Sequence, residues 1–453
     1  EFGVDKCAVL EIKGGMKAGY EGIELPDGQT IKVVDDGGYK YLGVLEGAGI
    51  KTREMKEMVR KEYLRRVKLV AGSKLYAGNL MSAVNVWAVS VVRYTAGILE
   101  WTDKELKAMD VKTRKILTMN GVFHMQSSVD RLYMKRKIGG RGLISVEQCV
   151  RSEEAGLCEY VKASDEWMLK VVAEDLVMGE SKDAYRKRVE KERSERLIGK
   201  KLHGKFFNEA KNVADDRSWQ WLRGGFLDKR TEGFVCAAQE KVLNTRCFSK
   251  TVMKQDVNVM CRLCGKSAET VGHLTSGCGM LAQREYRRRH DKMGLRVYWE
   301  LCGKYGIKRS DRWFEEVPDV VRVSNDGQYE IWWDRAVITT KKMEHNRPDV
   351  VVIDRVLRRG WIVDFAVSFD NNVVRKEDEK TTNYDSLTTE LRGMYGLSTV
   401  FVVPIVVGSL GVVSSRLAGN LKKLGIGDVV GGLQTSAIIG TAAILRKVLN
   451  KTV

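Results

Sequence analysis

The chain has 453 residues, of which 43% are hydrophobic and 30% are charged. This length exceeds what one compact core usually takes, so two to four domains are expected, and four prolines in all exclude long proline-rich linkers. Lysine and arginine exceed aspartate and glutamate by 77 − 59 = 18 charges, which favours a polyanionic partner over a membrane surface or an acidic protein.

Neither a secretory signal nor a disulfide framework is indicated. The first residues contain no basic start and no apolar run of the signal type. The most apolar segment, 399–413, is short for a membrane span and is interrupted by Pro404, Gly408 and Gly411, so we interpret it as a core strand. Nine cysteines in so long a chain indicate a reducing, intracellular setting.

The N-terminal half changes from strand-like to helical patterns. Residues 1–50 favour short strands and turns, with β-type runs at 6–13 and 38–46. Residues 51–120 carry apolar side chains at three- and four-residue spacing, which is typical of helices. Residues 150–255 are predicted to be mostly helical and heavily charged.

Three cysteines and a histidine follow at the spacing Cys261-x2-Cys264-x8-His273-x4-Cys278. The C-x2-C turn directs two thiolates to one point, and the more distant pair closes a tetrahedron around Zn²⁺. Because four protein ligands leave no open position, the predicted zinc is structural and stabilises a loop with little core of its own. The alternative is four ordinary buried residues.

A basic helix with aromatic residues is predicted directly after the zinc loop, at 283–302. Its cationic side chains suit phosphate contacts, and the rings of Tyr286, Tyr298 and Trp299 suit base stacking. The alternative is a solvated charged face, with His290 as a structural contact. The residues assigned to nucleic-acid binding are Arg287, Arg288, Arg289, His290 and Lys292, with Arg284 beside them.

After residue 306 the pattern becomes that of an α/β domain. Strands are predicted near 328–340, 349–354, 361–367 and 399–407, and helices near 376–394, 412–424 and 435–449.

Two aspartates stand beside the two central strands of this region, in RPDVVVIDRVLRRGWIVDFAVSFD (347–370). Asp349 opens the first strand, and Asp364 lies in the second. Two acids at one sheet edge repel and lose hydration unless a divalent cation lies between them. A Mg²⁺ held in this way activates water and stabilises charge on a phosphodiester. The alternative is a strand-entry turn at Asp349 and an ordinary strand end at Asp364.

A lysine beside the two acids would complete such a site, because it can orient the water or neutralise developing charge. Downstream, Lys376, Lys380 and Tyr384 lie four residues apart on one face of a predicted helix. Upstream, Asp334 lies in another apolar run.

The order of these motifs resembles the C-terminal half of a non-LTR retrotransposon polyprotein. The group that it resembles carries a restriction-enzyme-like endonuclease behind its reverse transcriptase. The motifs are CRLC…HL…C, RRRHDK, WWDRAVIT, RPDVVVID…WIVDFAV and EDEK…Y, with EFGVDKCAVL, GYKYLGVLEG, RLYMKRKIGGRGLISVEQC and TEGFVCAAQEKVLNTR before them and LQTSAIIGTAAILRKVL after them.

The resemblance implies a multidomain α+β chain. Its segments are a remnant of the reverse-transcriptase palm at 1–50, a helical thumb-like region at 51–165, a basic helical linker at 166–255, a CCHC zinc knuckle with the basic helix at 256–305, and a C-terminal α/β restriction-endonuclease-like domain at 306–453.

The resemblance also implies an activity and its residues. Asp349 and Asp364 match the Mg²⁺-binding acids of the nuclease and Lys380 its best-placed lysine, while Tyr384 and Asp334 match family positions in the same catalytic region. The implied reaction is Mg²⁺-dependent nicking of target DNA, and the 3′ hydroxyl primes reverse transcription of the element's RNA. Target DNA and element RNA are the implied partners, and the nucleus is the implied location.

Two departures from the family pattern change what is expected. Many relatives of this nuclease fold have a lysine two residues after the second acid, where this chain has Ala366, so the function is expected to move to Lys380. The paired aspartates of the polymerase precede the block that starts near Glu1, so polymerisation is expected only of a longer parent. The alternatives are a catalytically inactive, zinc-containing nucleic-acid-binding remnant and a host protein with a captured DNA-binding domain.

Overall fold

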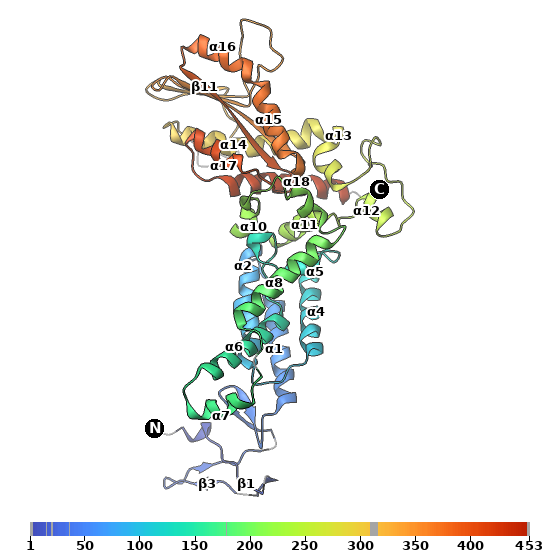
Figure 1. The fold of residues 1–453 in the computed structure, drawn as a ribbon, viewed down its shortest axis with the longest axis vertical. Coiled ribbons are helices and arrows are strands. Elements are labelled where there is room, and N and C mark those ends of the chain that lie inside the picture. The colour runs from blue at the N-terminus through green and yellow to red at the C-terminus, as the bar shows by residue number, and fades with distance from the viewer. Residues whose placement is uncertain are drawn as a thin grey trace. The chain divides into compact units, whose positions relative to one another are not determined.

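The computed structural model describes residues 3–14, 16–19, 21–35, 37–177, 179–308 and 316–450 (Figure 1). The chain divides into two compact units, each built from separate stretches of sequence. The first unit contains Glu1–Ser73, Ser82–Ile116 and Ile144–Val189, and the second contains Lys74–Met81, Leu117–Leu143 and Glu190–Val453.

The N-terminal part of the first unit consists of three short antiparallel pairs of strands. The run expected over 38–46 is a hairpin rather than one strand, because Leu42 and Gly43 both have positive φ and reverse the chain. The run at 6–13 forms a paired strand only at its end. The pairs are β1 (Ile12–Lys13) with β2 (Met16–Lys17), β3 (Ile23–Glu24) with β4 (Thr30–Ile31), and β5 (Tyr39–Tyr41) with β6 (Val44–Glu46).

Helices dominate from residue 52 to residue 251, as the spacing of apolar residues predicts. The helix α1 buries Met55, Val59, Tyr63 and Val67, one residue per turn along one face. No helix of the described ranges has both the length and the apolar character that a bilayer crossing requires. The helices are α1 (Thr52–Gly72), α2 (Ala77–Ala83), α3 (Val89–Thr95), α4 (Asp103–Met119), α5 (Val129–Tyr133), α6 (Val146–Ala163), α7 (Trp167–Asp175), α8 (Lys182–Gly199), α9 (Lys205–Ala210), α10 (Gln220–Gly224), α11 (Lys229–Gln239) and α12 (Arg246–Thr251).

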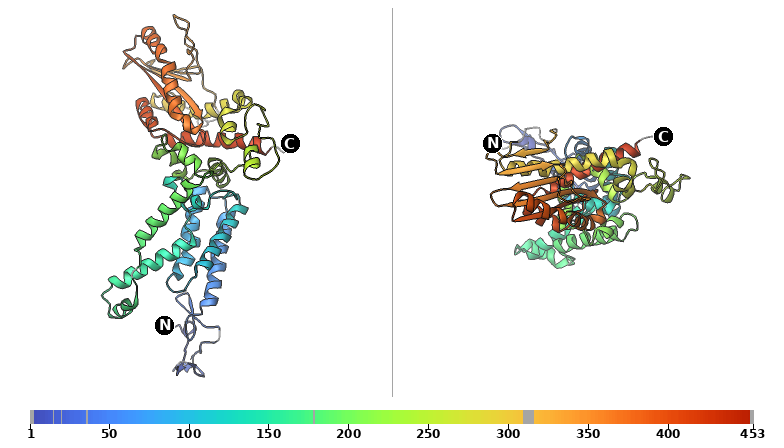
Figure 2. Two further views of the ribbon diagram at one scale, coloured as in Figure 1. Left: turned by 45° about the vertical axis from the view of Figure 1, so that its right-hand side comes forward. Right: turned by 90° about the horizontal axis from the view of Figure 1, so that it is seen from above.

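The second unit contains a five-stranded mixed sheet, whose strands lie side by side in the right-hand view of Figure 2. Only β10 and β11 are parallel; the other neighbours are antiparallel. This sheet and the helices around it confirm a mixed α+β architecture. The strand order is β11 (Thr399–Gly408), β10 (Arg359–Ser368), β9 (Val350–Asp354), β8 (Tyr329–Trp333) and β7 (Val321–Val323).

Several predicted boundaries in this unit are wrong. β7 was not predicted, and β8 ends at Trp333 rather than near 340, because Asp334 has a φ of 45° that extended backbone does not adopt. The helix predicted at 376–394 is two helices that meet at Tyr384. The helices here are α13 (Gly279–Leu281), α14 (Arg287–Lys304), α15 (Val373–Asn383), α16 (Asp385–Tyr395), α17 (Arg416–Leu424) and α18 (Val430–Leu449).

Alternate residues of the central strands pack against helices on the two faces of the sheet. Trp361, Val363 and Phe365 of β10 join the core formed with α14, α17 and α18. Ile362 joins the opposite core, which includes residues of α16 and Tyr384. Because side chains alternate along a strand, Asp364 projects to the same face as Ile362, toward α15 and α16.

Candidate functional site

The pairing of β9 with β10 brings the two predicted acids together. Val350 pairs with Val363 as the last pair of the ladder, so Asp349 stands opposite Asp364 at the next position. Directly opposed residues of antiparallel strands project their side chains to one face, with Cβ atoms about 5 Å apart. The Phe365 amide also donates a hydrogen bond to Asp349 Oδ2 at 2.6 Å, which turns this carboxylate toward β10.

Asp364 is a buried carboxylate contacted by the two predicted partners on its face of the sheet. Lys380 Nζ, from α15, forms an ion pair with Asp364 Oδ2. The Tyr384 hydroxyl, from the junction of α15 and α16, donates to Asp364 Oδ1 at 3.3 Å. Burial and the neighbouring Asp349 raise the pKa of Asp364 to about 7, against the opposing effect of Lys380. Lys376, one turn earlier, instead pairs with Glu379 at 2.6 Å.

Asp349 is contacted from the other side of the sheet by His290 of α14. His290 Nε2 lies 3.2 Å from Asp349 Oδ2 and 3.1 Å from the Phe365 carbonyl oxygen, and its Nδ1 lies 3.0 Å from Asp291 Oδ1. Both ring nitrogens therefore face acceptors, as an imidazolium requires. Burial would lower the pKa of His290, but Asp291 and Asp349 raise it to about 10. Burial would raise the pKa of Asp349, but His290 lowers it to about 2.

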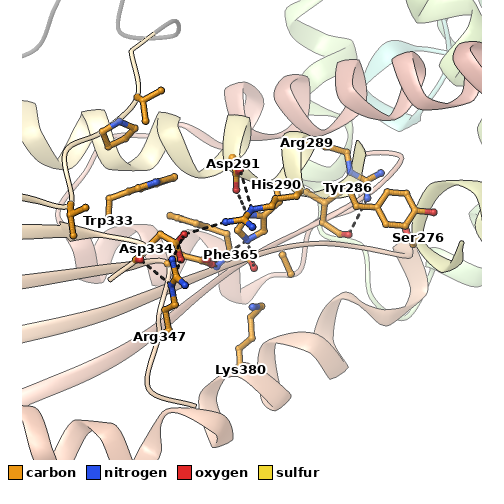
Figure 3. A pocket seen from close by; sticks show the side chains of 17 residues that line it. Ser276, Tyr286, Arg289, His290, Asp291, Trp333, Asp334, Arg347, Phe365 and Lys380 are labelled. Atoms are coloured by element: carbon orange, nitrogen blue, oxygen red, sulfur yellow. Dashed lines mark hydrogen bonds and ion pairs between the residues drawn. The ribbon is translucent and has the colours of Figure 1, made fainter. Parts of the chain in front are cut away.

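A cavity of about 800 Å³ opens beside the acid pair, and Asp334 lies at one end of it (Figure 3). Its carboxylate is 2.8 Å from Arg347 Nε and 3.4 Å from Arg287. Its backbone amide donates to the Asp349 carbonyl oxygen at 2.8 Å. Asp334 therefore belongs to the site by position, and its carboxylate pairs with two arginines.

The charged residues of the basic helix α14 lie in different surroundings: an open cavity, a groove and the protein core. Arg287 lines the cavity, Arg288 and Lys292 line a separate groove between α14 and α18, and Arg289 borders both. Arg289 is only 3% exposed and lies against α18, where Gly440 leaves room for it. The expectation that Tyr298 and Trp299 stack on bases is wrong, because both are fully buried in the core beneath the sheet. The interpretation of α14 as one continuous basic face is therefore too simple.

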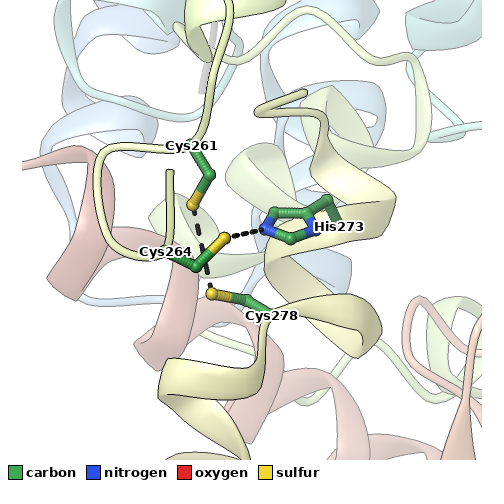
Figure 4. A group of neighbouring side chains, drawn as sticks. All are labelled: Cys261, Cys264, His273 and Cys278. Atoms are coloured by element: carbon green, nitrogen blue, oxygen red, sulfur yellow. Dashed lines mark hydrogen bonds between the residues drawn. The ribbon is translucent and has the colours of Figure 1, made fainter. Parts of the chain in front are cut away.

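The four predicted zinc ligands converge on one point, as Figure 4 shows. Their ligand atoms all lie within 4.8 Å of one another, with 4.0 Å between the sulfurs of Cys261 and Cys278 and 3.3 Å from Cys264 Sγ to His273 Nε2. Three thiolates and one imidazole are a donor set that suits Zn²⁺. This cluster can hold a metal ion, and all its ligands come from one short loop.

The zinc loop is attached to the start of α14 through Tyr286. The Tyr286 hydroxyl accepts a hydrogen bond from the Cys278 amide at 3.1 Å and donates to the Leu274 carbonyl oxygen at 2.9 Å. The same loop is braced by the ion pair of Arg262 with Glu269 at 2.7 Å. A metal ion held by these four residues would thus fix the loop that borders the cavity, where Ser276 lines the wall.

We expect Cys264→Ala to remove bound zinc, because three ligands hold the ion less tightly. The turn around Cys264 should loosen most, because Val271 and Leu274 are also held in a hydrophobic core. Zinc content by atomic emission should fall from about one ion per chain to well below that, and limited proteolysis should cut the loop. The control is Cys247→Ala, a half-buried cysteine near the loop but outside the cluster. A full zinc content in Cys264→Ala would contradict this assignment.

No family model and no curated protein matches this chain. The resemblance in motif order therefore remains an expectation.

Proposed function

We propose that this chain is a Mg²⁺-dependent nuclease that nicks target DNA, as the C-terminal part of a non-LTR retrotransposon reverse transcriptase. The observation that carries the proposal is the opposition of Asp349 and Asp364 across β9 and β10, with Lys380 on Asp364 and an open cavity beside them. The two acids and the lysine come from neighbouring segments of the chain: the start of β9, β10 and α15.

The two carboxylates are the residues that would hold the cation. Burial and the neighbouring Asp349 raise the pKa of Asp364 to about 7, and a divalent cation between the two carboxylates would favour the ionised form of both. Bound between them, Mg²⁺ would supply an activated water and stabilise the charge that develops on a phosphodiester. Oxygen-only carboxylate ligands suit Mg²⁺, in contrast to the sulfur-rich zinc cluster.

The remaining residues would position the reacting groups. The Lys380 ammonium lies where it can neutralise charge on the phosphate oxygens, since it already contacts Asp364. The Tyr384 hydroxyl holds the other Asp364 oxygen. Arg287 and Arg347 at the cavity are about 60% exposed and can contact the backbone of the strand that enters.

The partners follow from the proposed reaction. An excess of 18 positive charges suits long polyanions, here the target DNA and the element's own RNA. Chromosomal DNA as target places the reaction in the nucleus. The rival function is a zinc-containing module that binds nucleic acid without cutting it.

Nicking of supercoiled plasmid in Mg²⁺ tests the proposal directly. We expect the unaltered chain to convert plasmid to the open-circular form, and both Asp349→Ala and Asp364→Ala to be slower by at least about 100-fold, because the cation loses half of its carboxylate ligands. Circular dichroism and zinc content verify that both variants fold. If the unaltered chain binds DNA and never nicks it, the rival function holds. Equal nicking by the unaltered chain and both variants would exclude these acids from the mechanism.

The lysine assignment has a matched control on the same helix. Lys380→Met should slow nicking by about 100-fold or more, because removal of one preorganised positive group usually costs this much. Lys376→Met, one turn earlier and paired with Glu379, should stay within about twofold of the parent. Single-turnover rates on a fluorescent duplex give both numbers. Equal losses in the two variants would indicate a general effect of charge on DNA binding.

Cation binding should depend on pH through Asp364. Mg²⁺ binds the carboxylate and not the carboxylic acid, so affinity should fall about tenfold for each pH unit below 7, and should level off above about 8. Asp349, whose pKa is lowered to about 2, adds no dependence in this range. Isothermal titration of Mg²⁺ between pH 5.5 and 8.5 measures this slope. An affinity that stays constant from pH 6 to pH 8 would exclude Asp364 as a ligand.

A further inference from the structure

A buried arginine without a carboxylate partner lies at one end of the cavity. Arg289 is 3% exposed, and among the described residues its guanidinium donates to two neutral acceptors: Thr441 Oγ1 at 2.9 Å and the Val367 carbonyl oxygen at 3.4 Å. Its Nε has no hydrogen-bond partner among the described residues. The nearby Asp370 attracts Arg289 but is engaged by Ser409, Leu410 and Val412 instead. A buried cation that lacks an ion pair is unusual, because desolvation is costly without one.

A second polar group without a partner lines the same cavity. Ser276 lies on the zinc loop, and its hydroxyl is buried with no hydrogen-bond partner in the described chain. Figure 3 shows Ser276, Tyr286 and Arg289 at one end, with Asp334 and Arg347 at the other end and His290 between them. A buried donor that is left unsatisfied destabilises the folded state, because it loses its bonds to water and gains none in return. Two of them at one end of one open cavity indicate a place that is completed by a ligand.

The chemistry of this end selects an anion. A guanidinium and a hydroxyl are the donors that contact phosphate oxygens, and the Tyr286 ring, 5.1 Å from the Arg289 guanidinium, holds it in place. The hydroxyl of Tyr286 is occupied by the zinc loop, so it does not compete for this role. Of the acidic residues that line the cavity among the described residues, Asp291 and Asp334 lie away from this end (Figure 3), and Asp349 is bound to His290.

We infer that Ser276 and Arg289 form a second phosphate subsite, which binds a backbone phosphate of the strand that is cut. Val367, which contacts Arg289, lies three residues beyond Asp364 on β10, or about 10 Å along the strand. At a rise of about 3.4 Å per nucleotide, this phosphate is within about three nucleotides of the one at the acid pair. That the anion belongs to the strand that is cut rests on the proposed function. That this end of the cavity binds an anion rests on Ser276 and Arg289 alone.

DNA binding without added Mg²⁺ tests this subsite separately from cleavage. Fluorescence anisotropy of a 20-base-pair duplex is measured over a range of NaCl concentrations. Arg289→Met should reduce the slope of log K against log[NaCl] by about 0.9, the value for one lost phosphate contact. Arg289→Lys should keep most of the slope. The matched control is Arg296→Met, two turns along α14, with an equally buried Nε but outside the cavity; it should leave the slope unchanged.

Ser276→Ala provides a variant whose folding is not in doubt. Removal of a buried hydroxyl without a partner should leave the thermal midpoint unchanged or raise it slightly, while DNA binding weakens about threefold. An unchanged affinity in Ser276→Ala, together with a parental salt slope in Arg289→Met, would show that both groups are structural. If Arg289→Met keeps the salt slope of the unaltered chain and nicking is normal, the subsite is excluded while the proposed nuclease function stands. If Arg289→Met reduces the salt slope but the unaltered chain never nicks DNA, the subsite stands and the proposed nuclease function is excluded.

Discussion

The opposition of two carboxylates across β9 and β10 is the constraint on which the site depends. At a separation near 5 Å and an effective dielectric constant near 20, two such charges repel by roughly 3 kcal/mol. Cationic groups from both faces of the sheet offset this repulsion. Lys380 forms an ion pair with Asp364, and His290 contacts Asp349. The sheet thus carries the negative charge, and the two helical layers carry the compensating charge.

The register of the sheet explains why this arrangement is specific. A shift of β9 by one residue against β10 would send Asp349 to the other face, because side chains alternate along a strand. The apolar residues fix the register, since Val350 and Val352 enter one core while Val351 and Ile353 enter the other. The position of the acids is therefore set by residues that have no chemical function.

The sequence alone predicts those parts of the site that depend on local spacing. The four zinc ligands are close in sequence, and a C-x2-C turn leaves little freedom, so their convergence was foreseeable. Lys380 and Tyr384 were found through helical spacing, although α15 ends between them. His290 at Asp349 was not predicted, because this contact depends on how α14 packs on the sheet. One local feature could have indicated this packing: Gly294, one turn further along α14, lets the helix approach Phe365 closely.

Basic residues in a run do not form one surface when the run is a helix. Within α14, Arg287 reaches the cavity, Arg288 an exposed groove, and Arg289 a buried position. The period of 3.6 residues separates neighbours in sequence by about 100° around the axis. Net charge therefore indicates the class of partner, whereas the burial of each arginine decides which of them can contact it. Arg289 is the most buried of the three and has no carboxylate partner among the described residues, and for this reason it is the one most in need of an anion.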